Sequence, residues 1–425
     1  MVRGDIVYRT YIRILEEELV PAMGCTEPIA IAYCAAKARD VLGAFPDRIE
    51  LLVSGNIIKN VKSVVVPNTN GLKGIEAAVG AGIVGGRAEK VLEVLAEMTD
   101  AQKAEIPVFL ADCPIIIKPS ECEHALDIHM MLFRGEHSAS VRISGFHTNI
   151  VLIKKDGEIL YAAGETQGEE ANNPTNRTLL TIEGIVEFAG ILETEDVAEL
   201  LERQISYNMK IAKEGIEHSW GANVGSVLLK QRDDIRTRAR AFAAAGSDAR
   251  MSGCELPVVI NSGSGNQGMT ASIPVIIYAQ ELGKTKEELY RALTLSNLIT
   301  IHQKSGIGRL SAYCGAISAG CGAGCGIAYL QGGDYRAIAH TLVNSLAIVS
   351  GIVCDGAKAS CAAKIASAVD AGIFGYEMYL AGEQFHGGDG LVSKGVENTL
   401  QNISRLGKIG MKETDKEIIR IMTGC

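Results

Sequence analysis

Three cysteines in the last third of the chain have the types and spacing that most favour chemistry. Cys354 and Cys361 enclose the segment Asp-Gly-Ala-Lys-Ala-Ser, and Cys314 lies forty residues earlier, between a tyrosine and a glycine. Packing as small apolar side chains explains them poorly, because glycines and polar residues surround them. Three thiolates from two separate segments favour a metal cluster. On a four-iron cluster they leave one iron without a protein ligand, and such an iron acts as a Lewis acid.

The spacing of these cysteines constrains the elements that carry them. On one straight helix, Cys354 and Cys361 would lie about 10 Å apart along the axis, which is long for ligands of one compact cluster. Gly356 relieves this, because Cys354 can lie in a loop while Cys361 lies in the first turns of a following helix. Cys321 and Cys325 have Gly and Ala neighbours and favour packing. No C-x₂-C pair supports a zinc ribbon or a bacterial ferredoxin.

Cys25 precedes a predicted helix over residues 29–41, with Thr26 as its candidate N-cap. A helix N-terminus lowers the pKa of a thiol, which would favour the reactive thiolate. The other interpretation is a free thiol in a turn.

The segment Gly263-Ser-Gly-Asn-Gln-Gly268 has the G-x-G-x-x-G spacing of dinucleotide-binding loops. That fold needs a second strand about 20 residues on, ending in an acidic residue. Here the residues from Thr285 are helical in pattern and Pro274 interrupts the helix, so we expect no NAD site. Backbone N–H groups at a helix start still favour a cradle for an anion such as a small carboxylate. A tight turn between helices is the alternative.

Composition limits the partners. Hydrophobic residues make up 47% of the 425 residues, aromatic residues only 5%, and there are 47 glycines, which is typical of closely packed helices. The net charge of −9 disfavours nucleic acid and anionic membranes as partners. We expect no membrane span and no signal peptide. Eleven cysteines without an export signal favour a cytoplasmic protein that uses thiols for metal binding or catalysis.

The pattern along the chain predicts an α+β fold of two domains. We expect N-terminal helices within 1–44 that pack on the catalytic domain, an α/β domain at 45–165 with a mainly antiparallel sheet, and a large all-helical catalytic domain at 176–425. The β-branched runs at 49–54 and 61–66 are typical of strands, and Asp156-Gly157 of a hairpin turn.

Several motifs together resemble the L-cysteine desulfidases, relatives of the iron-sulfur L-serine dehydratases, nearly from end to end. The motifs are Pro21-Ala-Met-Gly-Cys-Thr-Glu-Pro28, Pro67-Asn-Thr, His147-Thr-Asn149, Ser262-Gly-Ser-Gly-Asn-Gln-Gly268, Gly308-Arg-Leu-Ser-Ala-Tyr-Cys314, Cys354-Asp-Gly-Ala-Lys-Ala-Ser-Cys361 and Gly387-Gly-Asp-Gly390.

The resemblance implies a [4Fe-4S] cluster bound by Cys314, Cys354 and Cys361, with Cys25 as the catalytic base. It implies conversion of L-cysteine to pyruvate, ammonia and sulfide without electron transfer, by a homodimer whose α/β domain looks like a regulatory domain. The terminal Cys425 is similar to a cysteine that caps the fourth iron in some serine dehydratases. It is therefore a candidate fourth ligand, the alternative being a free terminal thiol.

A mechanistic hypothesis assigns the remaining residues. The substrate carboxylate lies on the loop, helped by Arg309, and the substrate thiol binds the open iron while Cys25 removes the Cα proton. His302 contacts the substrate or orients its neighbours. The loop residues that we expect to bind substrate are Ser262, Ser264, Asn266 and Gln267.

Three rival functions remain open. A pyridoxal-phosphate lyase would need a Schiff-base lysine, and Lys358 between two cysteines is an odd place for one, so we expect no pyridoxal phosphate. L-Serine dehydration could use the same scaffold. A non-catalytic iron-sulfur or amino-acid sensor would hold a cluster without turnover.

Overall fold

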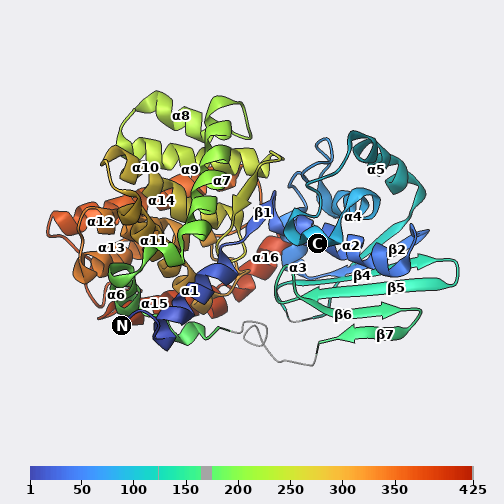
Figure 1. The fold of residues 1–425 in the computed structure, drawn as a ribbon, viewed down its shortest axis with the longest axis horizontal. Helices are drawn as coiled ribbons and strands as arrows, with labels where there is room; N and C mark the ends of the chain where they lie inside the picture. The colour runs from blue at the N-terminus through green and yellow to red at the C-terminus, as the bar shows by residue number, and fades with distance from the viewer. Residues whose placement is uncertain (123, 164–174, 424–425) are drawn as a thin grey trace.

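The computed structural model describes residues 1–122, 124–163 and 175–423. It has a large helical part and a smaller part that combines helices with a sheet, and the two lie side by side (Figure 1). The predicted α+β class is confirmed.

The smaller part is built on a six-stranded sheet in the order β3-β2-β4-β5-β6-β7. Only β2 and β3 pair in parallel, and every other neighbouring pair is antiparallel, as predicted. Alternate residues of β2, Ile49, Leu51 and Val53, are buried, so one face of that strand packs on the core. The elements are α2 (Thr26–Leu42), β2 (Arg48–Val53), α3 (Gly55–Val61), α4 (Gly74–Gly85), η1 (Ala88–Glu93), α5 (Asp100–Asp112), β3 (Ile115–Pro119), β4 (Asp127–Arg134), β5 (His137–Ser144), β6 (Ile150–Lys155) and β7 (Glu158–Ala162).

The prediction of a strand at 61–66 is wrong. Helix α3 ends at Val61, and from this run only Val65 forms an isolated bridge, to Lys73. Val64 and Val66 are nevertheless fully buried. A short apolar run indicates burial without deciding between strand, helix and loop.

Helices make up most of the larger part. The elements are α1 (Ile6–Glu18), β1 (Pro21–Met23), η2 (Arg177–Leu179), α6 (Ile182–Ile191), η3 (Thr194–Asp196), α7 (Ala198–Glu217), α8 (Val224–Gln231), α9 (Ile235–Met251), β8 (Pro257–Val259), α10 (Gly265–Glu281), α11 (Lys286–Ile307), α12 (Gly315–Leu330), α13 (Tyr335–Val349), α14 (Ser360–Leu380), α15 (Val396–Arg405), η4 (Leu406–Gly410) and α16 (Lys412–Thr423).

The two N-terminal helices pack on different parts of the molecule. In α1, Tyr8 and Tyr11 meet the ring of Phe188 in α6 edge-on, with centroids 5.0 and 5.2 Å away. Helix α2 instead packs against α4 and strands β4 and β5. Strand β1, between them, pairs antiparallel with β8. The start of α2 therefore lies where the two parts meet. The domain boundaries at 44, 165 and 176 stay a prediction.

Small residues let the central helices approach closely. A Cβ added at Gly320 of α12 would lie 2.5 Å from the Ala368 backbone, and one at Gly324 would lie 2.4 Å from the Gly372 carbonyl oxygen. Both neighbours belong to α14. Cys321 and Cys325 lie in the same helix and are fully buried, which fits the packing role expected of them.

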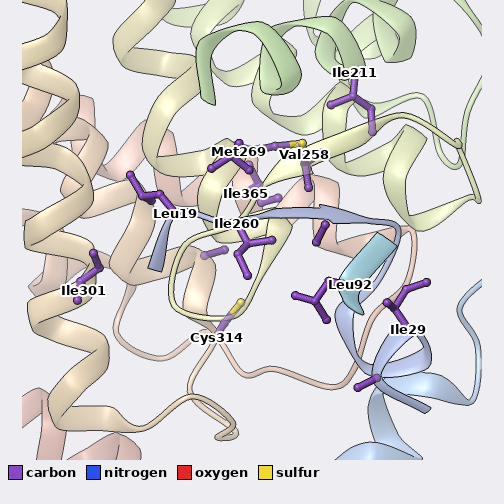
Figure 2. Close-up of a cluster of buried hydrophobic side chains, with 14 of the residues drawn as sticks. Leu19, Ile29, Leu92, Ile211, Val258, Ile260, Met269, Ile301, Cys314 and Ile365 are labelled. Atoms are coloured by element: carbon purple, nitrogen blue, oxygen red, sulfur yellow. The ribbon is translucent and has the colours of Figure 1, made fainter. Parts of the chain in front are cut away.

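A continuous apolar core runs through both parts. Figure 2 shows it around the start of α12, where Cys314 lies among buried side chains that include Ile260 and Ile365. Within the described residues, no helix is both long enough and apolar enough to cross a membrane.

Candidate active site

Four helices begin around one cavity of about 100 Å³. Cys25 is the N-cap of α2, Ser264 that of α10 and Cys314 that of α12, while Cys361 is the second residue of α14. Each helix start presents unpaired N–H groups and a partial positive charge. Their convergence therefore favours anions, both thiolates and a ligand carboxylate.

The three predicted ligand cysteines all line this cavity. Residues 312–314 and 352–354 run antiparallel, with a bridge between Tyr313 and Val353. The Cys314 N–H donates to the Ile352 carbonyl (3.3 Å), and the Cys354 N–H donates to the Ala312 carbonyl (2.6 Å). This pairing brings two segments that are forty residues apart together at the cavity.

The loop from Cys354 to Cys361 is held by its lysines. Lys358 donates to the Asp355 carbonyl oxygen (2.7 Å), and Lys364 donates to the Val353 carbonyl oxygen (2.9 Å). Both lysines also form ion pairs with the Asp355 carboxylate. Lys358 does not line the cavity, so its position does not favour a role as a Schiff-base lysine.

The protonation of these thiols depends on what occupies the site. Burial raises the pKa of Cys314 to about 12, with a further contribution from Cys354, and burial also raises the pKa of Cys361. Both are therefore neutral thiols until a cation stabilises their thiolates.

Within the described residues, no three His, Cys, Asp or Glu side chains stand close enough to share a single metal ion. Ligands of a four-iron cluster each bind a different iron, so they stand farther apart than the ligands of one ion. Three cysteines around one cavity are a donor set that fits such a cluster.

Cys25 faces the same cavity and is buried. Its thiol donates to Glu27 Oε2 at 3.1 Å. Burial raises the pKa of Cys25 well above its usual value, and the Glu27 carboxylate raises it further. The expectation that the helix start favours a thiolate is therefore wrong for this state of the site. The expectation that Thr26 caps α2 is also wrong, because Cys25 occupies the N-cap position.

Glu27 is an ionised carboxylate inside the protein. Burial by itself would raise its pKa, but the nearby His147 imidazole and the Cys25 thiol lower it to about 2. Asn60 donates to its Oε1 at 3.1 Å, and His147 Nε2 lies 3.8 Å from the same oxygen. The sequence analysis gave Glu27 no role, although it lies two residues after Cys25.

The glycine loop lies opposite these groups. Thr26 Oγ1 is 3.0 Å from the Gly263 carbonyl oxygen, which ties the loop to the start of α2. Ser262 has φ near +50°, and Asn261 beside it is held by Asn297 at 2.9 Å. Strand β8 before the loop pairs antiparallel with β1, whereas a dinucleotide fold places this loop after a strand of a parallel sheet.

All four predicted loop residues line the cavity. The Oδ1 of Asn266 already accepts a hydrogen bond from Arg250 at 3.1 Å. Gln267 is buried, and its Oε1 accepts no hydrogen bond from the described residues. Gln267 therefore offers an acceptor to a ligand.

The structure brings Arg309 to the cavity but also pairs it. Its Nη2 donates to Glu18 at 2.7 Å, and its guanidinium stacks on Phe146, 4.4 Å from the ring centroid. Glu18 thus already offsets the charge that was expected to bind a substrate carboxylate.

His302 does not line the cavity. Its Nε2 lies 2.9 Å from Glu397 of α15, which explains why the side chain turns away. The expected substrate contact by His302 is therefore not found. Cys425 lies outside the described residues.

Several cavity residues carry charge or hydrogen-bonding groups that sequence reasoning missed. All but His147, which lies in the turn between β5 and β6, are inside helices, where a polar residue gives no local sign that it faces a cavity. They are Glu27, Asn56, Lys59, Asn60, His147, Arg250 and Lys304.

Comparison with known proteins agrees with this arrangement. The model of the family described as "Serine dehydratase alpha chain" matches residues 89–420. A UPF0597 protein of Desulfitobacterium hafniense is 62% identical over 99% of this chain and 98% of its own length. UPF0597 proteins of Lachnoclostridium phytofermentans and Treponema denticola are 52% and 45% identical, each over 98% of this chain and 100% and 98% of their own lengths. The chain therefore belongs to the serine dehydratase alpha chain family, a family of iron-sulfur dehydratases.

Proposed function

We propose that this protein is an L-cysteine desulfidase, which eliminates sulfide from L-cysteine and yields pyruvate and ammonia. Membership of an iron-sulfur dehydratase family supports a lyase that uses an iron-sulfur cofactor. The observation that carries the proposal is one cavity lined by Cys314, Cys354, Cys361 and Cys25. These thiols could hold a cluster and supply an acid–base group beside it.

The proposed cofactor is a [4Fe-4S] cluster on Cys314, Cys354 and Cys361. When bound, such a cluster supplies a Lewis acid that makes the substrate sulfur a better leaving group. The converging helix starts stabilise the three thiolates. Lys358 and Lys364, clamped on Asp355, keep the loop between Cys354 and Cys361 in place.

Cys25 is the proposed base that takes the Cα proton. It belongs to one small apolar cluster against which Cys361, one of the proposed cofactor ligands, also packs. Its thiol donates to Glu27 Oε2 in this state, so Cys25 has to lose that proton before it can act as the base. Gln267 Oε1, an unpaired acceptor, suits the substrate ammonium group.

L-Serine is the second candidate substrate, favoured by the description of the matching family. The same residues would then act on a hydroxyl leaving group. We further propose a cytoplasmic homodimer, on the grounds of the resemblance and the reducing conditions that free thiols need.

Anaerobic reconstitution with iron and sulfide tests the proposal directly. We expect close to four irons per chain, and sulfide and pyruvate in equal amounts from L-cysteine. Cys354→Ser should lose most of the iron, whereas the control Cys325→Ser, in the interior of α12, should keep it. Pyruvate from L-serine at a higher kcat/KM than from L-cysteine would assign the second candidate. A full cluster without turnover of either amino acid would contradict the enzyme and favour a sensor.

A further inference from the structure

The cavity wall contains a buried cation that forms no ion pair with the described residues. Arg250, in the last turn of α9, is 2% exposed and lines the cavity. Its Nη1 donates to Asn266 Oδ1 at 3.1 Å. Its Nε and Nη2 have no hydrogen-bond partner among the described residues. Burying a guanidinium raises the free energy of the folded protein unless an anion offsets its charge. The buried Arg250 therefore favours an anion in the cavity.

Three acidic groups face Arg250 from the elements packed against it. The groups with which it interacts electrostatically are Cys25, Glu27 and Cys361. The two oxygens of the Glu27 carboxylate already accept hydrogen bonds, Oε2 from the Cys25 thiol at 3.1 Å and Oε1 from Asn60 at 3.1 Å. Within the part of the chain that the structure describes, Arg250 forms no ion pair.

Arg309 provides the contrast. Both guanidinium groups line the cavity, but Glu18 neutralises Arg309 and Phe146 covers it. Arg250 has neither kind of partner. Of these two arginines, Arg250 is therefore the better candidate for an incoming carboxylate.

The glycine loop is shaped around this side chain. A Cβ added at Gly265 would lie 2.4 Å from Arg250 Nε and 2.7 Å from its Cζ. Any residue larger than glycine would thus push the guanidinium away. The second glycine of the loop therefore leaves room for the guanidinium of Arg250.

We propose that Arg250 binds the carboxylate of the amino-acid substrate through Nε and Nη2, an inference that rests on the proposed function. These two nitrogens form one edge of the guanidinium, which matches the two oxygens of a carboxylate. Gln267 Oε1, in the same cavity, suits the ammonium group of the same ligand. The site therefore selects zwitterionic amino acids over amines and amides.

A pair of unreactive ligands tests this on the reconstituted protein. L-Alanine has the carboxylate, whereas L-alaninamide has a neutral amide in its place, and calorimetric titration gives both affinities. We expect the wild type to prefer L-alanine. Arg250→Gln should weaken L-alanine binding by about thirtyfold or more, because removing one member of a buried charged pair has an effect of this size. The affinity for L-alaninamide should stay unchanged. Arg250→Lys keeps the positive charge but cannot donate two parallel hydrogen bonds, so it should recover part of the preference for L-alanine. Such a recovery would show that the loss in Arg250→Gln is not caused by misfolding.

Arg240→Gln is the matched control, because Arg240 lies on the same helix, pairs with Asp370 and does not line the cavity. It should bind both ligands as the wild type does. Iron content separates the proposal from a role in balancing the charge of the cluster. The proposal is overturned if Arg250→Gln keeps the preference for L-alanine, or if its only defect is loss of iron. The two proposals can fail separately. If the wild type releases no sulfide but Arg250→Gln still loses the preference for L-alanine, the desulfidase proposal is wrong and the carboxylate site stands.

Discussion

At the scale of single residues, the site is a set of buried polar groups, some paired and others unpaired. Glu27 is paired, since Cys25 and Asn60 donate to its two oxygens. Arg250 and Gln267, which line the same cavity, have buried atoms without a hydrogen-bond partner among the described residues. A buried polar atom without a partner costs free energy, so the unpartnered atoms that line the cavity favour a polar ligand there.

Replacing Cys25 tests its role as the base. In Cys25→Ala we expect kcat on L-cysteine to fall by about 10²–10⁴-fold, the usual contribution of a general base, with iron content unchanged. Cys34→Ala is the matched control, because Cys34 is an equally buried thiol on the same helix that faces the sheet carbonyl of Val141. Activity of Cys25→Ala within twofold of the wild type would remove Cys25 from the mechanism.

At the scale of elements, the site depends on where helices begin. The starts of α2, α10, α12 and α14 converge, and two loops are fixed by backbone pairing and by lysines. Away from the cavity, Glu397 joins three helices. It accepts from His302 of α11 and from the Ile182 N–H at the start of α6, while lying itself on α15.

The pair of His302 and Glu397 predicts a pH dependence of stability. Burial would raise the pKa of Glu397, but the hydrogen bond and charge of His302 lower it. A carboxyl group whose pKa is lower in the folded than in the unfolded protein stabilises the fold at pH values above its unfolded pKa of about 4.3. This stabilisation is lost as the pH falls through the pKa of the folded state.

In His302→Gln we therefore expect a lower urea midpoint at pH 7 and a shallower loss of stability as the pH falls below about 4.3. The KM for L-cysteine should change less than twofold, because His302 does not line the cavity. A tenfold higher KM would show that His302 does contribute to substrate binding.

At the scale of the whole molecule, the C-terminal helix links the two parts. Helix α16 follows the helical part in sequence but packs on α3 of the α/β part (Figure 1). The link is an ion pair between Asp415 and Lys59, whose side chain is 1% exposed and also lines the cavity. Ile419 covers Gly55, where an added Cβ would lie 2.8 Å from its Cδ1.

Breaking this ion pair should destabilise the protein. Asp415→Ala leaves the Lys59 charge buried without its partner, so we expect a loss of about 3–5 kcal/mol in the free energy of unfolding. Glu413→Ala, which removes an exposed pair with Lys416 on the same helix, should leave the urea midpoint almost unchanged. Equal midpoints for the two variants in urea unfolding would show that Asp415 does not join the two parts.

The sequence predicted the α+β class, the mainly antiparallel sheet and the thiol residues, because these leave local signs. Alternation marks a half-buried strand, and cysteines flanked by glycines and polar residues are poor packing residues. Helix α2 was expected to pack on the helical part but packs on the α/β part, because an apolar helix surface does not specify which part of the molecule it contacts. The apolar run at 61–66 likewise indicated that its residues are buried, but not which secondary structure they form.

The cysteines, the glycine loop and Arg309 could be picked out from the sequence, because their residue types and spacing are local features of the chain. Only the tertiary structure decided which charges remain unpaired. Arg309 meets Glu18, distant in the chain, while Arg250 reaches the cavity through the space left by Gly265. Pairing of buried charges depends on contacts between distant segments, and no local pattern records those contacts.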